Sequence, residues 1–381
     1  MEECIKYALS NNISLSNTEI SASVAQEEYR QSKRNMLPII GTGIGGGQLL
    51  GRSIDPKTNT YVSEGSIMSA NIYLSAQIDL FDGFKKQNRI RYNKLRYLMS
   101  KEDISQAQME LAFKVMNYYY DVLYYIELEK IASEQVKLTQ LNLKHTKKQI
   151  DLGLKAASDL LEMQAQEASE IHNQIVMKNK KETALLTLKK LMNFPISRNL
   201  ELSKKALLTF ANTVPSADSI YKMAQQHMPL LKKSALSVQA SKKNLAIQRG
   251  NLYPSLSFGG NISSSYSDSW TEPIDPNNNQ LGYKTISLHD QLSSNISKRL
   301  FLQLNIPIFS RWANRSAIKI ARYNLEVAQN ELKDTERLLH QEIVSEHQQL
   351  TALVEEQKQL QIKQKAMKEA YKVATKKMEQ G

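Results

Sequence analysis

The sequence has few of the residues that interrupt regular secondary structure. Its 381 residues include 14 glycines, 9 prolines and one cysteine, Cys4. A single cysteine excludes a disulfide framework within the chain. The helical apolar pattern around Cys4 indicates simple packing rather than a lipid attachment site. The long stretches between glycines and prolines are rich in Gln, Glu, Lys, Leu and Ala, which favours long helices over a compact α/β core.

Long apolar runs are also missing. No run approaches the roughly 20 residues that a membrane-spanning helix needs, and the chain opens on a polar amphipathic segment rather than a signal peptide. If the protein is exported, this sequence begins after the targeting segment or lacks one. The net charge is +12, but 38 acidic residues are interspersed among 50 basic ones. Such mixing is typical of solvated helix faces, so we predict no nucleic-acid partner.

The sequence shows no pattern of catalytic or cofactor chemistry. His340 and His347 lie on one predicted helix face, but no carboxylate or cysteine set accompanies them, so we expect no metal site. There is no Gly-rich phosphate loop and no Ser/His/Asp or Cys/His order, so we expect no enzyme and no cofactor. The tyrosines at 118–120, 124 and 125 are interpreted as large side chains at helix contacts, not as a ligand site.

An internal duplication organises the chain. Pro38, at the end of a helical pattern, corresponds to Pro254, 216 residues later. Phe81, at the end of an alternating segment, corresponds to Phe309, 228 residues later. The second half therefore has 12 more residues between these points, which we place in a surface loop. Each half predicts the order helix, strand, loop, strand and very long helix.

Four segments alternate between apolar and polar residues, a strand pattern with one apolar face. Soluble sandwiches show the same alternation, so half-buried strands of a soluble sheet are the alternative to membrane strands. Only four such segments occur, and each is long enough to supply the roughly ten residues that a tilted membrane strand needs. We therefore favour membrane strands, and predict them at 37–52, 66–82, 254–265 and 291–309.

Two very long helices are predicted, at 84–152 and 311–380, because neither range contains proline or glycine. At 1.5 Å per residue such a helix spans roughly 100 Å and needs partners along its length. Gly153 suits the left-handed residue that follows a helix end, and Ser158 or Asp159 can cap a following helix. A return helix is therefore predicted at 157–192.

These elements form two structural repeats joined by a linker. The second repeat stops at Gly381, the counterpart of Gly153, and so lacks a return helix; we read the chain as a fragment. The parts are the first repeat at 1–195 with its opening helix at 1–36, the linker at 196–215, and the second repeat at 216–381 with its opening helices at 216–252.

Four strands cannot close a barrel, and an open sheet would leave two unpaired edges in the membrane. Two copies would give eight strands, whose interior is filled by side chains, whereas three copies give 12, an even number within the range of bacterial barrels. The predicted fold is thus mainly α-helical with a four-stranded β contribution. Three chains would form a 12-stranded barrel on a tunnel of long helical hairpins.

Five motifs occur in order along the chain: Glu3–Asn12, Leu37-Pro38, Phe81-Asp82-Gly83, Asn117–Leu123 and Gly153–Glu162. With the duplication, they resemble the TolC-like outer-membrane efflux family over essentially the whole sequence. The resemblance implies a homotrimer in the cell outer membrane whose helical tunnel extends into the periplasm. It also implies passive conduction of small molecules or secreted polypeptides, delivered by an inner-membrane transporter and a periplasmic adaptor.

The same resemblance places adaptor docking at the tips of the helical hairpins. The second tip would begin at Gly381, so most of it lies beyond the sequence. The alternative function is a soluble coiled-coil scaffolding protein, which predicts no association with a membrane. By position, the first tip consists of Gly153, Leu154, Lys155, Ala156, Ala157, Ser158, Asp159 and Leu160.

Overall fold

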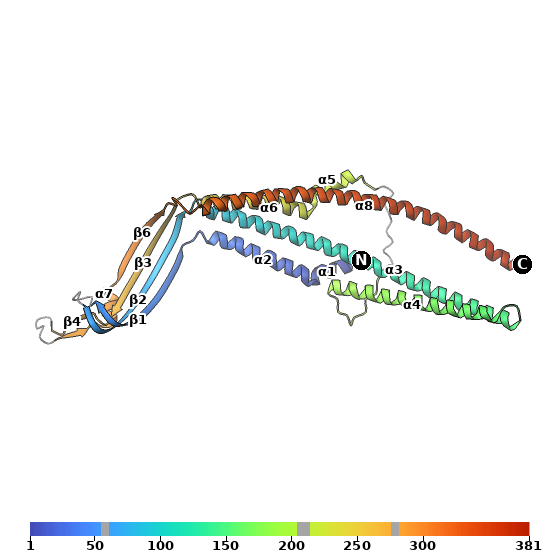
Figure 1. Ribbon diagram of the computed structural model, residues 1–381, viewed down its shortest axis with the longest axis horizontal. Coiled ribbons are helices and arrows are strands. Elements are labelled where there is room, and N and C mark those ends of the chain that lie inside the picture. The colour runs from blue at the N-terminus through green and yellow to red at the C-terminus, as the bar shows by residue number, and fades with distance from the viewer. Residues whose placement is uncertain (55–60, 204–213, 276–281, 381) are drawn as a thin grey trace. The chain divides into compact units, whose positions relative to one another are not determined.

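The computed structural model describes residues 1–54, 61–203, 214–275 and 282–380. The chain is mainly helical and contains a four-stranded antiparallel sheet (Figure 1), as the sequence predicted. It divides into two compact units, each of which takes segments from both halves of the sequence. One unit comprises Met1–Ala25, Tyr97–Leu236 and Asn330–Gly381; the other comprises Gln26–Arg96 and Ser237–Gln329.

The sheet lies in the second of these units, with the strand order β1-β2-β3-β6. All three neighbouring pairs are antiparallel, and in one row Thr42 pairs with Leu74, Leu74 with Ile262, and Ile262 with Lys298. Because successive residues of a strand point to opposite faces, this register fixes which side chains share a face. The strands are β1 (Ile39–Ile54), β2 (Tyr61–Phe81), β3 (Ser255–Ser267) and β6 (Ser297–Asn305).

The strand predicted at 291–309 is wrong at both ends. Its first residues belong to a short helix, α7 (Leu288–Ser294), which begins after Ser287 because the Ser287 hydroxyl accepts a hydrogen bond from the Asp290 N–H at 3.2 Å. The strand β6 ends at Asn305, and Pro307, which lacks an N–H, cannot continue the ladder. Two three-residue strands, β4 (Thr271–Pro273) and β5 (Tyr283–Thr285), were not predicted.

The helix predicted at 1–36 is divided at Asn12 into α1 (Glu2–Asn11) and α2 (Ile13–Arg34). Asn12 has an extended backbone, and its side-chain oxygen accepts the Leu15 N–H at 3.0 Å, as an N-cap does. Its amide nitrogen donates to the Leu191 carbonyl at 2.8 Å. Asn12 is therefore held by a contact distant in sequence, which periodicity does not reveal.

The second half also opens with two helices, α5 (Ala217–His227) and α6 (Pro229–Gly250). The three longest helices are α3 (Lys85–Asp151), α4 (Ala157–Met192) and α8 (Ala313–Gln380), with 67, 36 and 68 residues. Within the described ranges, no helix is both long enough and apolar enough to cross a membrane.

The core of the first unit lies where α1, α3 and α4 meet. Tyr119 is among its largest fully buried side chains, together with Leu188 and Met192 of α4. The Tyr119 hydroxyl donates to the Ser203 carbonyl at 2.7 Å. This tyrosine therefore fills a helix contact, as the sequence interpretation expected of the tyrosine cluster. The buried cluster consists of Ala8, Leu15, Leu111, Val115, Tyr119, Val122, Ala184, Leu188 and Met192.

Candidate functional site

The paired helices α3 and α4 form an antiparallel hairpin (Figure 1). On α3, Ala132, Val136 and Thr139 are buried at spacings of four and three residues, which is the spacing of a coiled-coil seam. Beside the seam, the Lys181 ammonium of α4 lies 2.5 Å from the Glu129 carboxylate of α3. The seam and the ion pair fix the two helices side by side and so fix the position of the turn that joins them.

The turn at the hairpin tip is a Schellman motif, in which a left-handed residue ends the helix. Gly153 has a φ of +76°, and its N–H donates to the Ile150 carbonyl at 2.8 Å. The Leu154 N–H donates to the Gln149 carbonyl, also at 2.8 Å. These two hydrogen bonds satisfy carbonyls that the end of α3 would otherwise leave unpaired. The left-handed conformation expected at Gly153 is thus confirmed.

The expected capping of α4 by Ser158 or Asp159 is wrong. Ala156 occupies the N-cap position, with no side-chain hydrogen bond, and its carbonyl accepts the Asp159 N–H at 3.1 Å. Ser158 and Asp159 lie within the first turn, because the helix begins two residues earlier than a side-chain cap would require. The Asp159 carboxylate there still interacts favourably with the positive end of the helix dipole.

The tip exposes apolar side chains together with one cation. Leu152 and Leu154 are 74% and 71% exposed, and Lys155 is also exposed. Neither leucine contributes to the buried core that the hairpin forms. The structure thus brings the predicted residues Gly153–Leu160 together in one turn and the start of α4. Gly381, the predicted start of a second tip, lies outside the described residues.

The base of the hairpin holds a buried cation that the sequence interpretation missed. Lys189 is only 8% exposed, and its ammonium donates to the carbonyls of Ile196 and Arg198 at 3.2 and 2.7 Å. Nearby, the Asn193 side chain donates to the Asn11 carbonyl at 3.2 Å. These contacts tie the segment after α4 and the end of α1 to the hairpin. A lone lysine at a helix end gives no sequence signal of such a role.

One face of the four-stranded sheet carries exposed apolar side chains. In one row of this face, Ala76 pairs with Gly260 and Gly260 pairs with Leu300. In the next row, Phe258 pairs with Leu302. Unlike a soluble sandwich, this face is not covered by a second sheet in the described part of the chain. The exposed apolar residues that the register places on it are Ile40, Ile44, Leu50, Met68, Ile72, Leu74, Phe258, Ile262, Leu300, Leu302 and Leu304.

The opposite face carries mostly glycine and polar residues, with the rings of Tyr73 and Phe301 and a few aliphatic side chains such as Ile39 and Leu49. A Cβ at Gly43 would meet the Tyr73 ring at 2.7 Å, so this ring lies directly over the glycine of the neighbouring strand. Gly259 stands in the same relation to the ring of Phe301. Aromatic rings that cover cross-strand glycines stabilise a strongly curved sheet. The two faces therefore differ as those of a membrane barrel wall do.

The short helix α7 occupies the free edge of β3 beyond the end of β6. Gln291 is 1% exposed, accepts the Ser267 N–H at 2.9 Å and donates to the Ser267 carbonyl at 2.9 Å. Its side chain thus makes the two hydrogen bonds that a paired strand would make. The Asn295 side chain adds a bond to the Ser265 carbonyl at 2.9 Å. No local pattern in the sequence distinguishes Gln291 from a surface glutamine.

A sheet with one exposed apolar face and long paired helices with an exposed tip are the features of an outer-membrane channel protein. The chain belongs to the outer membrane efflux protein family, whose model matches residues 4–193 and 220–381. No protein of curated function matches the sequence.

Several solved structures share the fold. A membrane protein from Pseudomonas aeruginosa is 16% identical, with 100% of this chain and 82% of that chain covered and a TM-score of 0.78. The channel protein CusC is 17% identical, with 90% and 73% covered and a TM-score of 0.72. The outer membrane protein VceC from Vibrio cholerae is 13% identical, with 90% and 77% covered and a TM-score of 0.70. At these identities the likeness establishes the fold.

Proposed function

We propose that three copies of this chain form a passive channel through the cell outer membrane. The observation that carries the proposal is the sheet itself. Its edge strands, β1 and β6, each have only one neighbour in the described part of the chain. An unpaired strand edge is too costly in a bilayer, where every backbone polar group needs a partner. Pairing β6 of one copy with β1 of the next closes a barrel of 12 strands from three copies.

The internal duplication accounts for the way each copy contributes to this barrel. We propose two repeats, at 1–195 and 216–381, joined by the linker 196–215. Each provides one strand pair, and β2 and β6 are followed by the long helices α3 and α8. Equivalent strand-to-helix connections allow both helices of every copy to enter one tunnel wall, which would extend into the periplasm.

The hairpin tip at Gly153–Leu160 is the proposed docking site for a periplasmic adaptor. Support comes from the exposed leucines of the tip and from the rigid support that the α3–α4 seam gives it. Through this adaptor the channel would receive substrates from an inner-membrane transporter. Those substrates are small molecules or secreted polypeptides. A soluble coiled-coil scaffold is not favoured, because the family match covers both the sheet and the helices.

Conduction in a planar bilayer tests the proposal. The purified protein should insert, form a trimer that resists heating in detergent, and conduct ions without an energy source. The fractionation of expressing cells should place it in the outer membrane. A protein that stays monomeric, does not insert and shows no strand signal in circular dichroism would contradict the channel and favour the scaffold.

A further inference from the structure

The sheet–helix junctions of the second unit are strongly basic. From 83 to 96 the chain has six basic residues and no acidic one, and from 306 to 325 it has four basic residues and no acidic one. From 237 to 254 it has three basic residues and again no acidic one. All three segments lie where a strand of the sheet joins a helix. We call them the basic collar.

The three segments of the collar meet in space. A Cβ placed on Gly83 would collide with the Gly250 carbonyl oxygen, so the β2–α3 and α6–β3 junctions touch. The Asn314 side chain donates to the Asn251 carbonyl at 3.1 Å, which joins the β6–α8 junction to the same point. The collar is therefore one surface of one compact unit, although its parts are far apart in sequence.

Much of the charge in the collar has no acidic partner. Lys86 pairs with Asp79 at 2.9 Å, and Arg96 pairs with Glu28 at 2.8 Å. By contrast, Arg89, Arg91 and Lys94 of α3 form no ion pair with any described residue. The same holds for Arg311, which precedes α8, and for three cations at the start of α8. Those three follow one another at spacings of four and three residues, which places them on one helix face. They are Arg315, Lys319 and Arg322.

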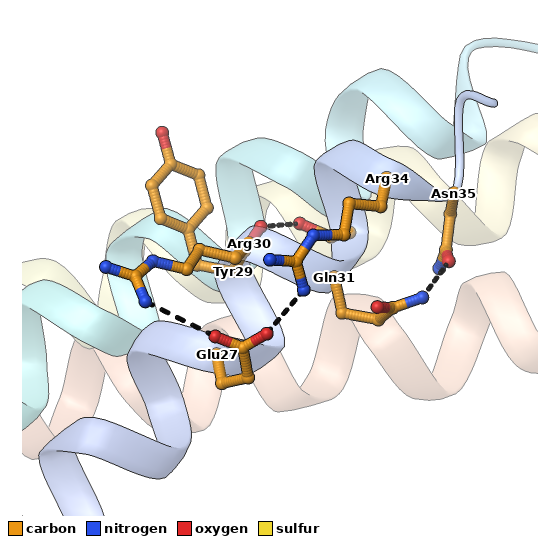
Figure 2. Close-up of polar contacts among 7 residues, drawn as sticks. Glu27, Tyr29, Arg30, Gln31, Arg34 and Asn35 are labelled. Atoms are coloured by element: carbon orange, nitrogen blue, oxygen red, sulfur yellow. Dashed lines mark hydrogen bonds and ion pairs between the residues drawn. The ribbon is translucent and has the colours of Figure 1, made fainter.

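The neighbouring helix α2 shows the opposite arrangement. Figure 2 shows the Glu27 carboxylate between the guanidinium groups of Arg30 and Arg34, which it contacts as an ion pair. The side chain of Gln31 donates to Asn35 at 2.9 Å in the same turn. The end of α2 therefore holds both arginines against its own glutamate, whereas Arg89, Arg91 and Lys94 of α3 remain available to an external anion.

Exposed aromatic and aliphatic side chains adjoin the collar. Ile308 and Phe309, between β6 and α8, are 94% and 74% exposed. Trp312 and Phe84, at the starts of α8 and α3, are 60% and 56% exposed, and Arg315 lies 4.5 Å from the Trp312 ring centre. The chain thus passes from an apolar strand to exposed aromatic rings and then to unpaired cations. Membrane proteins show this order of residue types from the hydrocarbon of a bilayer to its headgroups.

We propose that the basic collar binds the headgroups of anionic phospholipids at the bilayer surface nearest the helices. The inference rests on the proposed insertion of the sheet into a membrane. Arginine and lysine offer the donors that phosphate oxygens accept, and basic residues beside a membrane span attract acidic lipid. The collar would thus fix how deeply the sheet inserts into the bilayer.

Trp312 provides a reporter within the collar, because the chain has only one other tryptophan, Trp270. A Trp270→Phe protein would be reconstituted with phosphatidylglycerol or phosphatidylcholine that carries brominated acyl chains. We expect brominated phosphatidylglycerol to reach half-maximal quenching of Trp312 at a mole fraction about threefold lower than brominated phosphatidylcholine, because several interfacial cations attract acidic lipid. This preference should shrink as salt is added.

The variant Arg89→Gln/Arg91→Gln/Lys94→Gln should reduce the preference towards equality. The control, Lys363→Gln/Lys365→Gln/Lys368→Gln, makes the same charge change on exposed residues of α8 outside the collar and should retain it. Equal quenching by the two lipids in the parent protein, or an equal loss in the control, would overturn the inference. So would a collar variant that changes the ion selectivity of the channel but keeps the lipid preference, because the cations would then face the pore.

Conductance separates this result from a failure of the proposed channel. The collar variant should still insert and conduct in phosphatidylcholine bilayers. If the parent protein conducts but shows no lipid preference, only the collar inference fails. If it neither inserts nor conducts, the channel itself fails.

Discussion

Gly83 and Gly153 have similar left-handed backbones in different surroundings. Their φ values are +71° and +76°, but a Cβ on Gly83 would collide with the Gly250 carbonyl, whereas one on Gly153 would meet nothing within 4 Å. Gly153→Ala should cost only the left-handed penalty of about 1–2 kcal/mol. Gly83→Ala should cost a further 1–3 kcal/mol, roughly, from overpacking.

Thermal unfolding of the two variants measures this difference directly. The Gly153→Ala protein serves as the control, because it bears the same conformational penalty without the steric one. Equal melting temperatures for the two variants would show that the junction at Gly83 relaxes freely, and would weaken the account of close contact between the strand-to-helix turns.

Glu27 makes the end of α2 sensitive to pH. A hydrogen bond from Arg34 is the main cause that holds the pKa of the Glu27 carboxyl below its ordinary value of 4.5. A lowered folded-state pKa contributes stability that is fully present above the ordinary pKa and is lost as the pH falls through the folded-state pKa. Glu27→Gln should therefore lower the melting temperature slightly near neutral pH and have no effect at a pH well below 4.5.

The exposed Glu19 on the same helix provides the control for this pH dependence. Glu19→Gln should change the melting temperature by a similar, small amount at both pH values. If Glu27→Gln shows no dependence on pH, the ion pairs with Arg30 and Arg34 add nothing to the folded state, as many surface pairs do.

Helices and strands were predictable from the sequence where a regular residue pattern along the chain determines them. The long helices α3 and α8 contain no proline or glycine, and four strands were evident from their alternation. Prediction from the sequence was wrong where a single side chain makes a contact distant in sequence. Asn12 divides the first helix through its bond to Leu191, and Gln291 holds α7 against β3. Neither contact leaves a local pattern.

The hairpin tip was located by its glycine but not by its cap. Glycine adopts the left-handed conformation without strain, so Gly153 made the end of α3 predictable. The start of α4 was not, because Ala156 takes the N-cap position without a side-chain hydrogen bond. The buried Lys189 at the base of the hairpin was also missed, since its partners are backbone carbonyls.

The short helix α7 should depend on the one side chain that pairs with β3. Gln291→Leu would leave the N–H and carbonyl of Ser267 without partners, which costs about 1–3 kcal/mol for buried groups. We expect faster hydrogen exchange in the segment 264–267, measured by mass spectrometry. Ser294→Ala, at an exposed position of α7, should leave exchange unchanged. Equal exchange in both variants would show that α7 does not protect this edge.

The exposed turn at the end of the α3–α4 hairpin can be tested separately from the barrel. Lys155→Glu should reduce substrate export by about tenfold or more, because a reversed charge at a docking contact repels the partner surface. The yield of trimers should not change. Lys137→Glu, an exposed position on the shaft of α3, makes the same charge change away from the tip. Unchanged export in Lys155→Glu, or an equal loss in Lys137→Glu, would count against docking at the tip.

At the scale of the whole molecule, the open sheet is the feature that one chain cannot satisfy. Its faces differ in polarity, its edge strands are β1 and β6, and its apolar face is exposed. We propose that further copies continue the sheet into a closed barrel, and that three copies complete it.

Disulfide cross-linking between the edge strands tests that claim most directly. In a Cys4→Ser background, Ile40→Cys on β1 would be combined in turn with Leu300→Cys, Leu302→Cys or Leu304→Cys on β6, all on the apolar face. In the control, Leu74→Cys on the interior strand β2 is used in place of Ile40→Cys with the same β6 substitutions, and it should not link copies. We predict that one combination gives dimers and trimers on a denaturing gel and nothing larger. Links confined to one chain, or a ladder that continues beyond three copies, would contradict the trimeric barrel.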